Sequence, residues 1–204
     1  KTKDERIIAA AMKIFSRDGL AKGTIAGIAR EAGIGKGTVY EYFPSKDAVF
    51  EAMLASFFTQ ITESWAAINE LPLRPLEKIE QMIDAEFAML EDDQFMDIDI
   101  WSVIFEIILY YLRQREKGTP TVHLDRLMRK MYAGIRPVVE DGIHTGEIRE
   151  QAPEILTFLL FGMLDGLALH FYLQNHYYDK EKIRKQVKTL IFQGIQSPKG
   201  GKKQ

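Results

Sequence analysis

The chain has 204 residues, of which 46% are apolar, so it is long enough to bury a sizeable core in one large domain or two small ones. It contains no cysteine, which excludes disulfide and thiol chemistry and fits a reducing cytoplasm. The net charge of −2 is unevenly distributed, because residues 1–50 carry a net charge of +3 and the remaining residues carry −5. A polyanion such as DNA would therefore attract the N-terminal part of the chain and repel the rest.

The first helix is predicted over residues 5–17, after a charged start that does not resemble a signal peptide. Its apolar residues recur at helical spacing and share one side: Ile7, Ile8, Ala11, Ile14 and Phe15. A helix of this kind would cover the pair of helices that follows it along the chain. The three helices together would then form a small N-terminal head.

Residues 24–46, with the sequence TIAGIAREAGIGKGTVYEYFPSK, predict two short helices that meet at a glycine. Gly33 suits a turn that requires a positive φ, and Thr24 can cap the first helix through its hydroxyl. Small and apolar residues can hold the two helices at a steep angle: Ile28, Ala29, Ala32, Ile34 and Val39. The pattern favours a DNA-reading helix-turn-helix over the alternative, an ordinary helical hairpin.

The second of these helices, residues 36–43, is short and polar on one side, so packing alone does not explain it. That side offers hydrogen-bond donors, a bare backbone and flat rings, which come from Lys36, Gly37, Thr38, Tyr40 and Tyr42. Such a face suits the major groove of DNA. Gly37 costs a helix interior roughly 1 kcal/mol relative to alanine, and close approach of the backbone to DNA is one reason to keep it.

The segment IAREAGIGKGTVYEYFPSKDAVF resembles the signature of the tetracycline-repressor (TetR) family of bacterial transcriptional regulators, including the aromatic pair Tyr40 and Phe43 and the following Lys46. The resemblance covers essentially the whole chain and is most specific over residues 7–54. It implies that Lys36, Gly37, Thr38 and Tyr40 enter the groove, and that Thr24, Tyr42 and Lys46 hold DNA phosphates. Two glycines depart from the family pattern, because serine is usual at Gly35 and a second hydroxyl is common at Gly23.

A long helix is predicted to start after Ser45, to join head to body, and to end before the LPLRP break at 71–75. Proline and glycine breaks then separate four or five further helices, over about 76–92, 95–117, 121–145, 153–177 and 180–193. Because no segment alternates as a strand does, the expected fold class is all-α. The expected domains are a three-helix helix-turn-helix DNA-binding head at 1–47, a helical regulatory, ligand-binding and dimerisation body at 48–196, and a disordered tail at 197–204.

Residues 155–173 approach the length and apolarity of a membrane span, but Asp165 and His170 count against one. A helix that is apolar on nearly all sides is buried on nearly all sides, most simply across a dimer. The family resemblance implies the same four-helix interface. Its expected residues are Leu159, Gly162, Met163, Gly166, Val187, Leu190 and Ile191. A twofold dimer would present two recognition helices about 34 Å apart and would read a palindromic operator.

Large apolar side chains in the middle of the chain predict either an ordinary core or a cavity for a small, largely apolar effector. The expected cavity residues are Phe87, Trp101, Phe105, Tyr110 and Met128. A nearby acidic cluster could attract a cation, but a solvated helix junction is the simpler interpretation: Glu91, Asp92, Asp93, Asp97 and Asp99. The histidines lack metal-ligand spacing and the chain lacks phosphate loops and nucleophile motifs, so we expect no metal, no cofactor and no enzyme activity.

The sequence therefore predicts a cytoplasmic, ligand-responsive transcriptional regulator that acts as a repressor. A ligand that fits better when the two heads are splayed would lower DNA affinity, with the long helix after Ser45 as the lever. Two alternatives remain. The helix-turn-helix could act mainly through protein contacts, or the regulator could need a co-ligand before it binds DNA.

Overall fold

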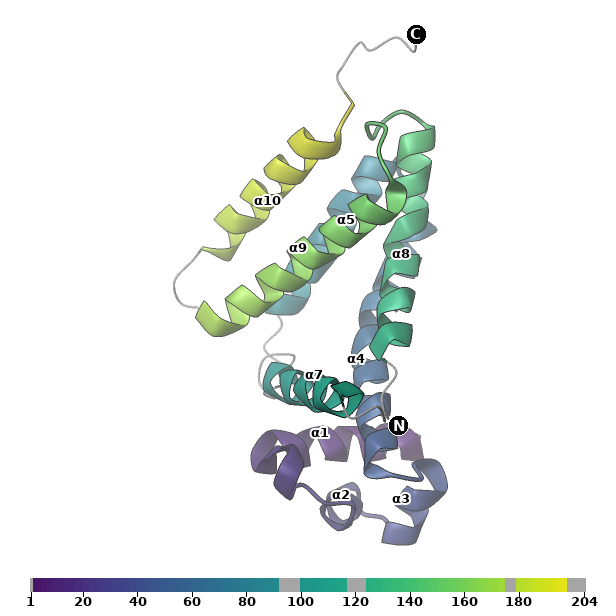
Figure 1. Cartoon of the computed structure of the whole chain (residues 1–204), viewed down its shortest axis with the longest axis vertical. Helices are drawn as coiled ribbons and strands as arrows, with labels where there is room; N and C mark the ends of the chain where they lie inside the picture. Colours follow the sequence, from purple (N-terminus) through teal and green to yellow (C-terminus); the bar gives the residue numbers. More distant parts are fainter. Residues whose placement is uncertain (1, 92–99, 117–123, 175–178, 198–204) are drawn as a thin grey trace. The chain divides into compact units, whose positions relative to one another are not determined.

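The computed structural model describes residues 2–91, 100–116, 124–174 and 179–197, and helices are the regular elements throughout these ranges (Figure 1). The all-α prediction is therefore confirmed. The N-terminal helices are α1 (Lys3–Lys22), α2 (Ile25–Ala32), α3 (Lys36–Tyr42) and α4 (Lys46–Asn69). The later helices are α5 (Pro75–Glu91), α7 (Ile100–Glu116), α8 (Leu124–His144), α9 (Pro153–Gln174) and α10 (Lys180–Ile195).

The chain divides into two compact units, which we call the head unit and the body unit. The head unit comprises Lys1–Thr59 and Asp93–Leu127, and the body unit comprises Gln60–Asp92 and Met128–Gln204. Helix α4 therefore contributes its first part to the head unit and its last part to the body unit. Helix α7 groups with the head unit, whereas a body beginning at residue 48 was expected to include it.

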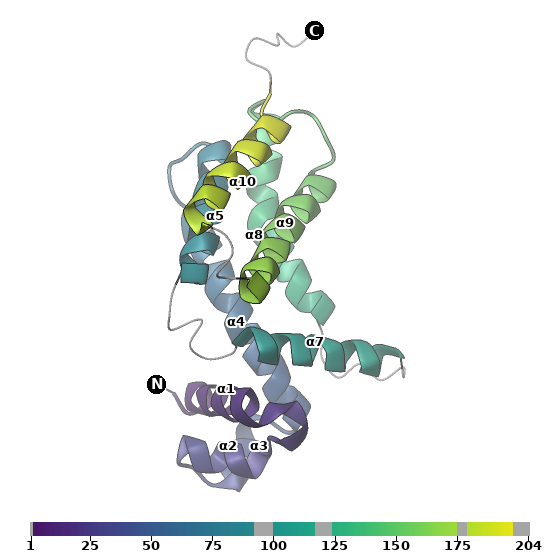
Figure 2. The same ribbon diagram turned by 90° about the vertical axis from the view of Figure 1, so that its left-hand side faces the viewer.

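The head unit is built on an apolar core between α1 and its neighbours. Ile7, Ile28 and Val39 come from α1, α2 and α3 and are fully buried. The rings of Phe15 on α1 and Phe50 on α4 meet edge to face, with their centroids 5.0 Å apart. Figure 2 shows α2 and α3 together beneath α1 in this unit. The helix-turn-helix therefore rests on a packed scaffold.

The body unit holds a second core around Trp65, which is almost fully buried. Its ring meets Phe161 of α9 edge to face, and Phe87 of α5 meets Phe171 of α9 in the same way. Lys188 of α10 donates hydrogen bonds to Glu80 and Asp84 of α5, which ties α10 to α5. In Figures 1 and 2, helices α5, α9 and α10 run alongside one another.

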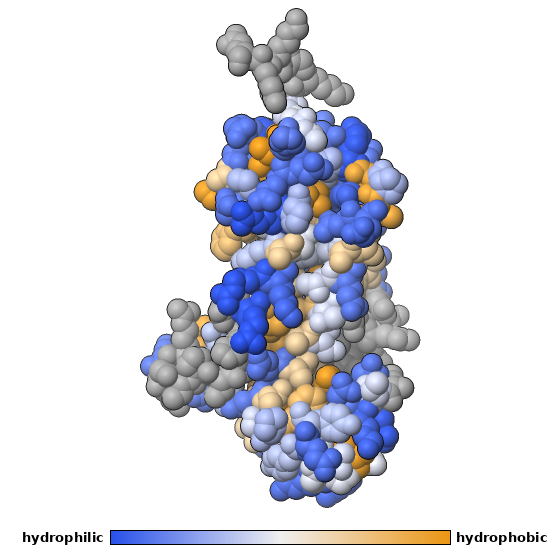
Figure 3. Space-filling view, turned by 90° about the vertical axis from the view of Figure 1, so that its right-hand side faces the viewer, coloured by the Kyte–Doolittle hydropathy of each residue, from blue (hydrophilic) through white to orange (hydrophobic). Residues whose placement is uncertain are grey.

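Helix α9 has two apolar sides, and only one of them is buried in the body unit. The buried side includes Leu156, Leu160, Leu164 and Phe171. The other side carries most of a set of exposed large residues that we call the exposed apolar row: Ile155, Phe158, Leu159 and Met163 of α9 and Leu190 of α10. On the face drawn in Figure 3, by contrast, apolar residues form small patches between larger hydrophilic areas. A row of large apolar side chains indicates a surface that another protein covers.

Within the described residues, Pro153–Phe171 is the one helical segment long and apolar enough to cross a membrane. Part of that segment is buried against α4 and α5 residues of the body unit, through Phe161 and Phe171. A core helix of a globular unit has the same length and composition. Its packing therefore gives no support to a membrane span.

Candidate nucleic-acid interface

Helix α2 begins and ends as its sequence predicts. The Thr24 hydroxyl accepts a hydrogen bond from the Gly27 N–H at 3.1 Å, which caps the first turn. Gly33 ends the helix in the left-handed region, with φ 66° and ψ 38°, where a side chain would be strained. The N–H of Ile34 then donates to the Ala29 carbonyl and closes the turn. These contacts set the angle at which the chain enters α3.

Helix α3 is anchored by one buried side chain and presents the others. Val39 is fully buried, while Lys36, Gly37, Tyr40 and Tyr42 are exposed. Thr38 is part-buried. The Lys36 ammonium lies 5.8 Å from the centre of the Tyr40 ring, which orients both groups on one side of the helix. The outer side of α3 therefore offers the Lys36 ammonium, the Tyr40 hydroxyl and the bare backbone of Gly37, and Tyr42 is exposed at the end of the helix.

Gly35 and Gly23, the two departures from the family pattern, have different structural settings. Gly35 caps α3 without a side-chain hydrogen bond, so the first turn of this helix lacks the contact that a serine would supply. At Gly23, an added Cβ would lie 2.4 Å from the Phe15 ring. Glycine is therefore required at position 23 by the bulky ring beneath it, a constraint that the local sequence does not reveal.

Lys46 is part-buried, and its ammonium already has a partner in the head unit. It donates a hydrogen bond to the Leu20 carbonyl and lies within 6 Å of the centres of the Phe15 and Phe50 rings. Burial lowers the pKa of this ammonium. Because an ammonium has three donors, one carbonyl leaves capacity for a phosphate. The predicted phosphate contact stays a prediction, and the structure adds a positioning role for Lys46 within the head.

The expected dimer residues divide into exposed and buried sets. Leu159, Gly162, Met163 and Leu190 are exposed, and Gly166 is part-buried. An added Cβ at Gly162 or Gly166 would meet no atom of the described chain within 4 Å. Val187 and Ile191, in contrast, are buried within the body unit. They face the protomer's own core, so within the protomer the exposed residues of the predicted set are the ones that a second copy could reach, and the dimer interface stays a prediction.

The five expected cavity residues fall in both units. Phe87 and Met128 belong to the body unit, and Trp101, Phe105 and Tyr110 belong to the head unit. Phe87 is fully buried and packs on Phe171, as a core residue does. Tyr110 lines a pocket in the head unit. The effector site built from these residues stays a prediction.

The acidic cluster at Asp92, Asp93, Asp97 and Asp99 lies outside the described residues. Among the residues that the structure does describe, no group of three or more His, Asp or Glu side chains is placed to hold a metal ion. One carboxylate pair that sequence reasoning missed lies in the body unit, where burial and nearby Asp165 raise the pKa of Glu86 to about 7. In the sequence, this pair is indicated only by Asp165, an acid inside the apolar run of α9.

Comparison with known proteins assigns both parts of the chain. Residues 7–53 match the model of bacterial regulatory proteins of the tetR family, and residues 50–194 match the C-terminal region of YsiA-like proteins. The boundary between the two matches lies close to the expected end of the head at residue 47.

Curated relatives match over nearly their full length. The uncharacterized HTH-type transcriptional regulator YhgD of Bacillus subtilis is 28% identical over 191 residues, covering 93% of this chain and 94% of the relative. CymR of Pseudomonas putida, an HTH-type transcriptional regulator, is 30% identical over 188 residues, which cover 88% of this chain and 83% of the relative. Among solved structures, FadR of B. subtilis in complex with stearoyl-CoA superposes with a TM-score of 0.70 at 20% identity, covering 94% of this chain and 98% of that one. This chain is a DNA-binding transcriptional regulator that belongs to the TetR family of bacterial regulatory proteins.

Proposed function

We propose that this regulator is a cytoplasmic repressor that binds a palindromic operator as a homodimer and leaves it when an amphipathic acyl compound binds. The observation that carries the DNA-binding part is the outer side of α3, where Lys36, Gly37 and Tyr40 are exposed beside buried Val39. Exposed donors and rings on a helix too short to need them for packing fit the major groove.

Residue roles follow from position on the helix-turn-helix. Lys36, Gly37, Thr38 and Tyr40 would enter the groove, because they share the exposed side of α3 or its first turn. The contacts to phosphates would come from Thr24, Tyr42 and Lys46. The Thr24 hydroxyl accepts the Gly27 N–H and keeps its own proton to donate to a phosphate oxygen.

Support for an acyl effector comes from the body of the chain. The YsiA-like match spans residues 50–194, and FadR, which shares the fold, is solved with stearoyl-CoA. Large apolar residues of the body unit such as Phe87 are suited to packing around an alkyl chain. A ligand that binds the DNA-free state more tightly than the DNA-bound state would lower the affinity for the operator. The free energy of operator binding would weaken by the difference between the two ligand-binding free energies.

Operator selection tests the function directly. The purified dimer is used to select sites from random and genomic DNA at two salt concentrations, and we expect a palindrome that survives the higher salt. Lys36→Ala should weaken binding to that site roughly tenfold, and stearoyl-CoA should release it while free coenzyme A should not. Recovery of only weak, sequence-blind binding that vanishes with salt would instead favour a required co-ligand or a role in protein contacts.

Gly37→Ala should separate stability from DNA binding. An added Cβ at Gly37 would meet no atom of the described chain within 4 Å, and Gly37 is not among the glycines with a positive φ. The substitution should therefore raise the free energy of unfolding by about 1 kcal/mol through helix propensity. It should also lower operator affinity roughly tenfold, because the new methyl group would face DNA. Thermal unfolding and fluorescence anisotropy measure the two effects.

Gly194→Ala is the matched control, because Gly194 is an exposed helical glycine on α10 whose Cβ would also meet open space. It should leave operator affinity unchanged. If Gly37→Ala binds the operator as tightly as the wild type does, the outer side of α3 does not approach the DNA backbone at this residue.

A further inference from the structure

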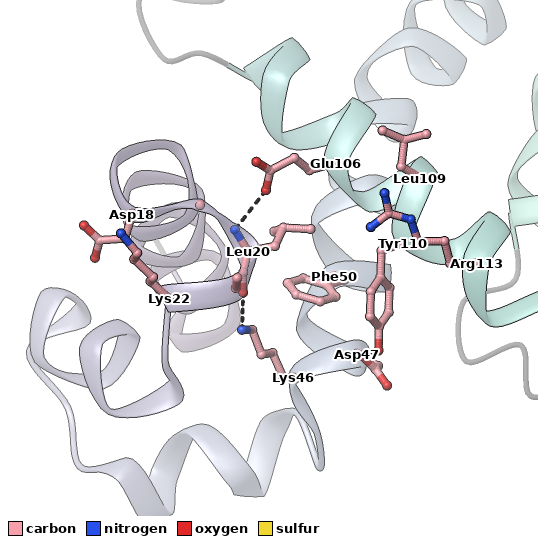
Figure 4. A pocket seen from close by; sticks show the side chains of 12 residues that line it. Asp18, Leu20, Lys22, Lys46, Asp47, Phe50, Glu106, Leu109, Tyr110 and Arg113 are labelled. Carbon is pink, nitrogen blue, oxygen red and sulfur yellow. Dashed lines mark hydrogen bonds between the residues drawn. The ribbon is translucent and has the colours of Figure 1, made fainter.

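The head unit contains a pocket of about 770 Å³ that no residue of the recognition helix α3 lines. It lies between the last turns of α1, the start of α4 and the middle of α7 (Figure 4). All of its lining residues belong to the head unit, and none is on α3. The pocket is therefore separate from the groove-facing residues of α3, although it shares Lys46 with the predicted phosphate contacts and Tyr110 with the expected cavity residues.

The carboxylates on the pocket wall are already engaged by the protein. Glu106 accepts a hydrogen bond from the Leu20 N–H at 2.9 Å, and Asp47 accepts one from the Tyr110 hydroxyl at 2.9 Å. Asp18 accepts two hydrogen bonds from Arg17, at 2.8 and 3.0 Å. Each of these three carboxylates therefore has a hydrogen-bond partner within the head unit, and Asp18 is also paired with the positive charge of Arg17.

The cationic side chains of the pocket wall, in contrast, retain hydrogen-bond donors that a ligand could use. Lys46 donates to the Leu20 carbonyl and retains further donors. Arg113 is exposed and makes no ion pair or hydrogen bond with any described residue, although its guanidinium carries five N–H donors. In Figure 4 its side chain turns back from α7 toward the space bordered by Phe50 and Tyr110. The groups of the pocket that can donate hydrogen bonds to an anion therefore include the ammonium of Lys46 and the guanidinium of Arg113.

The rest of the pocket is apolar and partly aromatic. Leu20 and Phe50 form its floor, and the rings of Phe50 and Tyr110 meet edge to face with centroids 5.7 Å apart. Leu109 lies on the rim and is about half exposed, at 53%. The exposed apolar surface of this rim is in contact with water, and a bound ligand would cover it. The wall therefore suits a flat apolar body next to a charged end.

We propose that this pocket binds an amphipathic organic anion of the aromatic carboxylate class. The carboxylate would pair with the planar guanidinium of Arg113, which can donate two parallel hydrogen bonds to it. The apolar body would lie against Phe50, Leu109 and Tyr110. The site shares one residue, Tyr110, with the expected effector cavity, and it does not depend on the operator or on the groove contacts.

Titration with 2-naphthoate, followed by calorimetry on the full chain without DNA, tests the site. The uncharged counterpart 2-naphthamide should bind at least about tenfold more weakly, because it lacks the charge that pairs with Arg113. Arg113→Gln should weaken 2-naphthoate binding by a similar factor. Since Arg113 is exposed, this variant should keep the unfolding temperature and the operator affinity of the wild type.

Arg126→Gln is the matched control, because Arg126 is an exposed arginine of the same unit that does not line the pocket. It should bind 2-naphthoate as the wild type does. The proposal is overturned if 2-naphthoate shows no saturable binding in the millimolar range, if the amide binds equally well, or if Arg113→Gln binds as tightly as Arg126→Gln. Since neither DNA nor an acyl thioester is present, such a failure leaves the repressor function untouched.

Discussion

Leu159→Asp is expected to convert the dimer to monomers and to lower operator affinity by about 1,000-fold, toward the level of non-specific binding. Leu159 lies in the exposed apolar row of α9 and is 54% exposed in the protomer. The substitution therefore costs the isolated protomer little. In a twofold dimer, however, each copy would bury a carboxylate without a partner, at a cost of several kcal/mol.

Loss of the dimer lowers operator affinity because it removes one of the two recognition helices. Two α3 helices joined in one molecule bind two half-sites with the entropy cost of a single association, whereas a monomer gains only half of the contacts. Analytical ultracentrifugation measures the association state, and fluorescence anisotropy on the selected operator measures affinity. Both should change together as protein concentration is varied.

Leu71→Asp provides the control for this experiment. Leu71 is an exposed leucine at 42%, outside α9 and α10, so the same change of chemistry there should leave both association and DNA binding intact. If Leu159→Asp remains a dimer, the exposed apolar row is not the dimer surface. In that case another surface of the protomer must provide it.

Most helix boundaries could be predicted from the sequence because they depend on local chemistry. Ser45 caps α4 by accepting the Ala48 N–H at 3.0 Å, and Pro153 occupies the first turn of α9. Gly33 has the positive φ expected of a helix-ending turn. The predicted helix at 121–145 corresponds to α8 at Leu124–His144. Caps, prolines and glycines act within a few residues of themselves, so one sequence is enough to locate them.

Features that depend on distant residues could not be predicted. Gly23 is fixed by the Phe15 ring, and the Leu20 N–H finds its acceptor on α7, in Glu106. The grouping of α7 with the head unit follows from such contacts, which have no signature in the local sequence. Helical periodicity placed Val187, Leu190 and Ile191 on adjoining faces of α10. It does not reveal that the protomer's own core covers two of them and leaves Leu190 exposed.

The candidate DNA site was more accessible to sequence reasoning than the candidate effector site. The predicted groove residues lie within the seven consecutive residues of α3, so helical periodicity alone distinguishes buried Val39 from its exposed neighbours. The five expected cavity residues come from three helices that the structure divides between two units. A cavity depends on how such helices pack, and composition indicates only that large apolar side chains are available for it.

Glu86→Gln is expected to stabilise the protein by about 3 kcal/mol at pH 8 and to have little effect at pH 5. Burial in the body unit, together with the charge of Asp165 on α9, raises the pKa of Glu86 to about 7. Its ordinary value is 4.5, so the folded chain holds a proton between these two pH values that the unfolded chain has released. The stabilisation from this proton is complete below about pH 4.5 and is lost as the pH rises through about 7.

Glutamine resembles the protonated carboxyl group at every pH, so the variant should lose no stability through this group. Chemical unfolding at pH 5, 6, 7 and 8, at one fixed protein concentration, gives the free energy of unfolding of both proteins. The two curves should be closest at pH 5 and should separate toward pH 8. Asp165→Asn removes a neighbouring charge that helps burial to raise the pKa of Glu86, so in that variant the loss of stability should end at a lower pH and be smaller. Parallel curves for wild type and Glu86→Gln would show that Glu86 is ionised throughout this range.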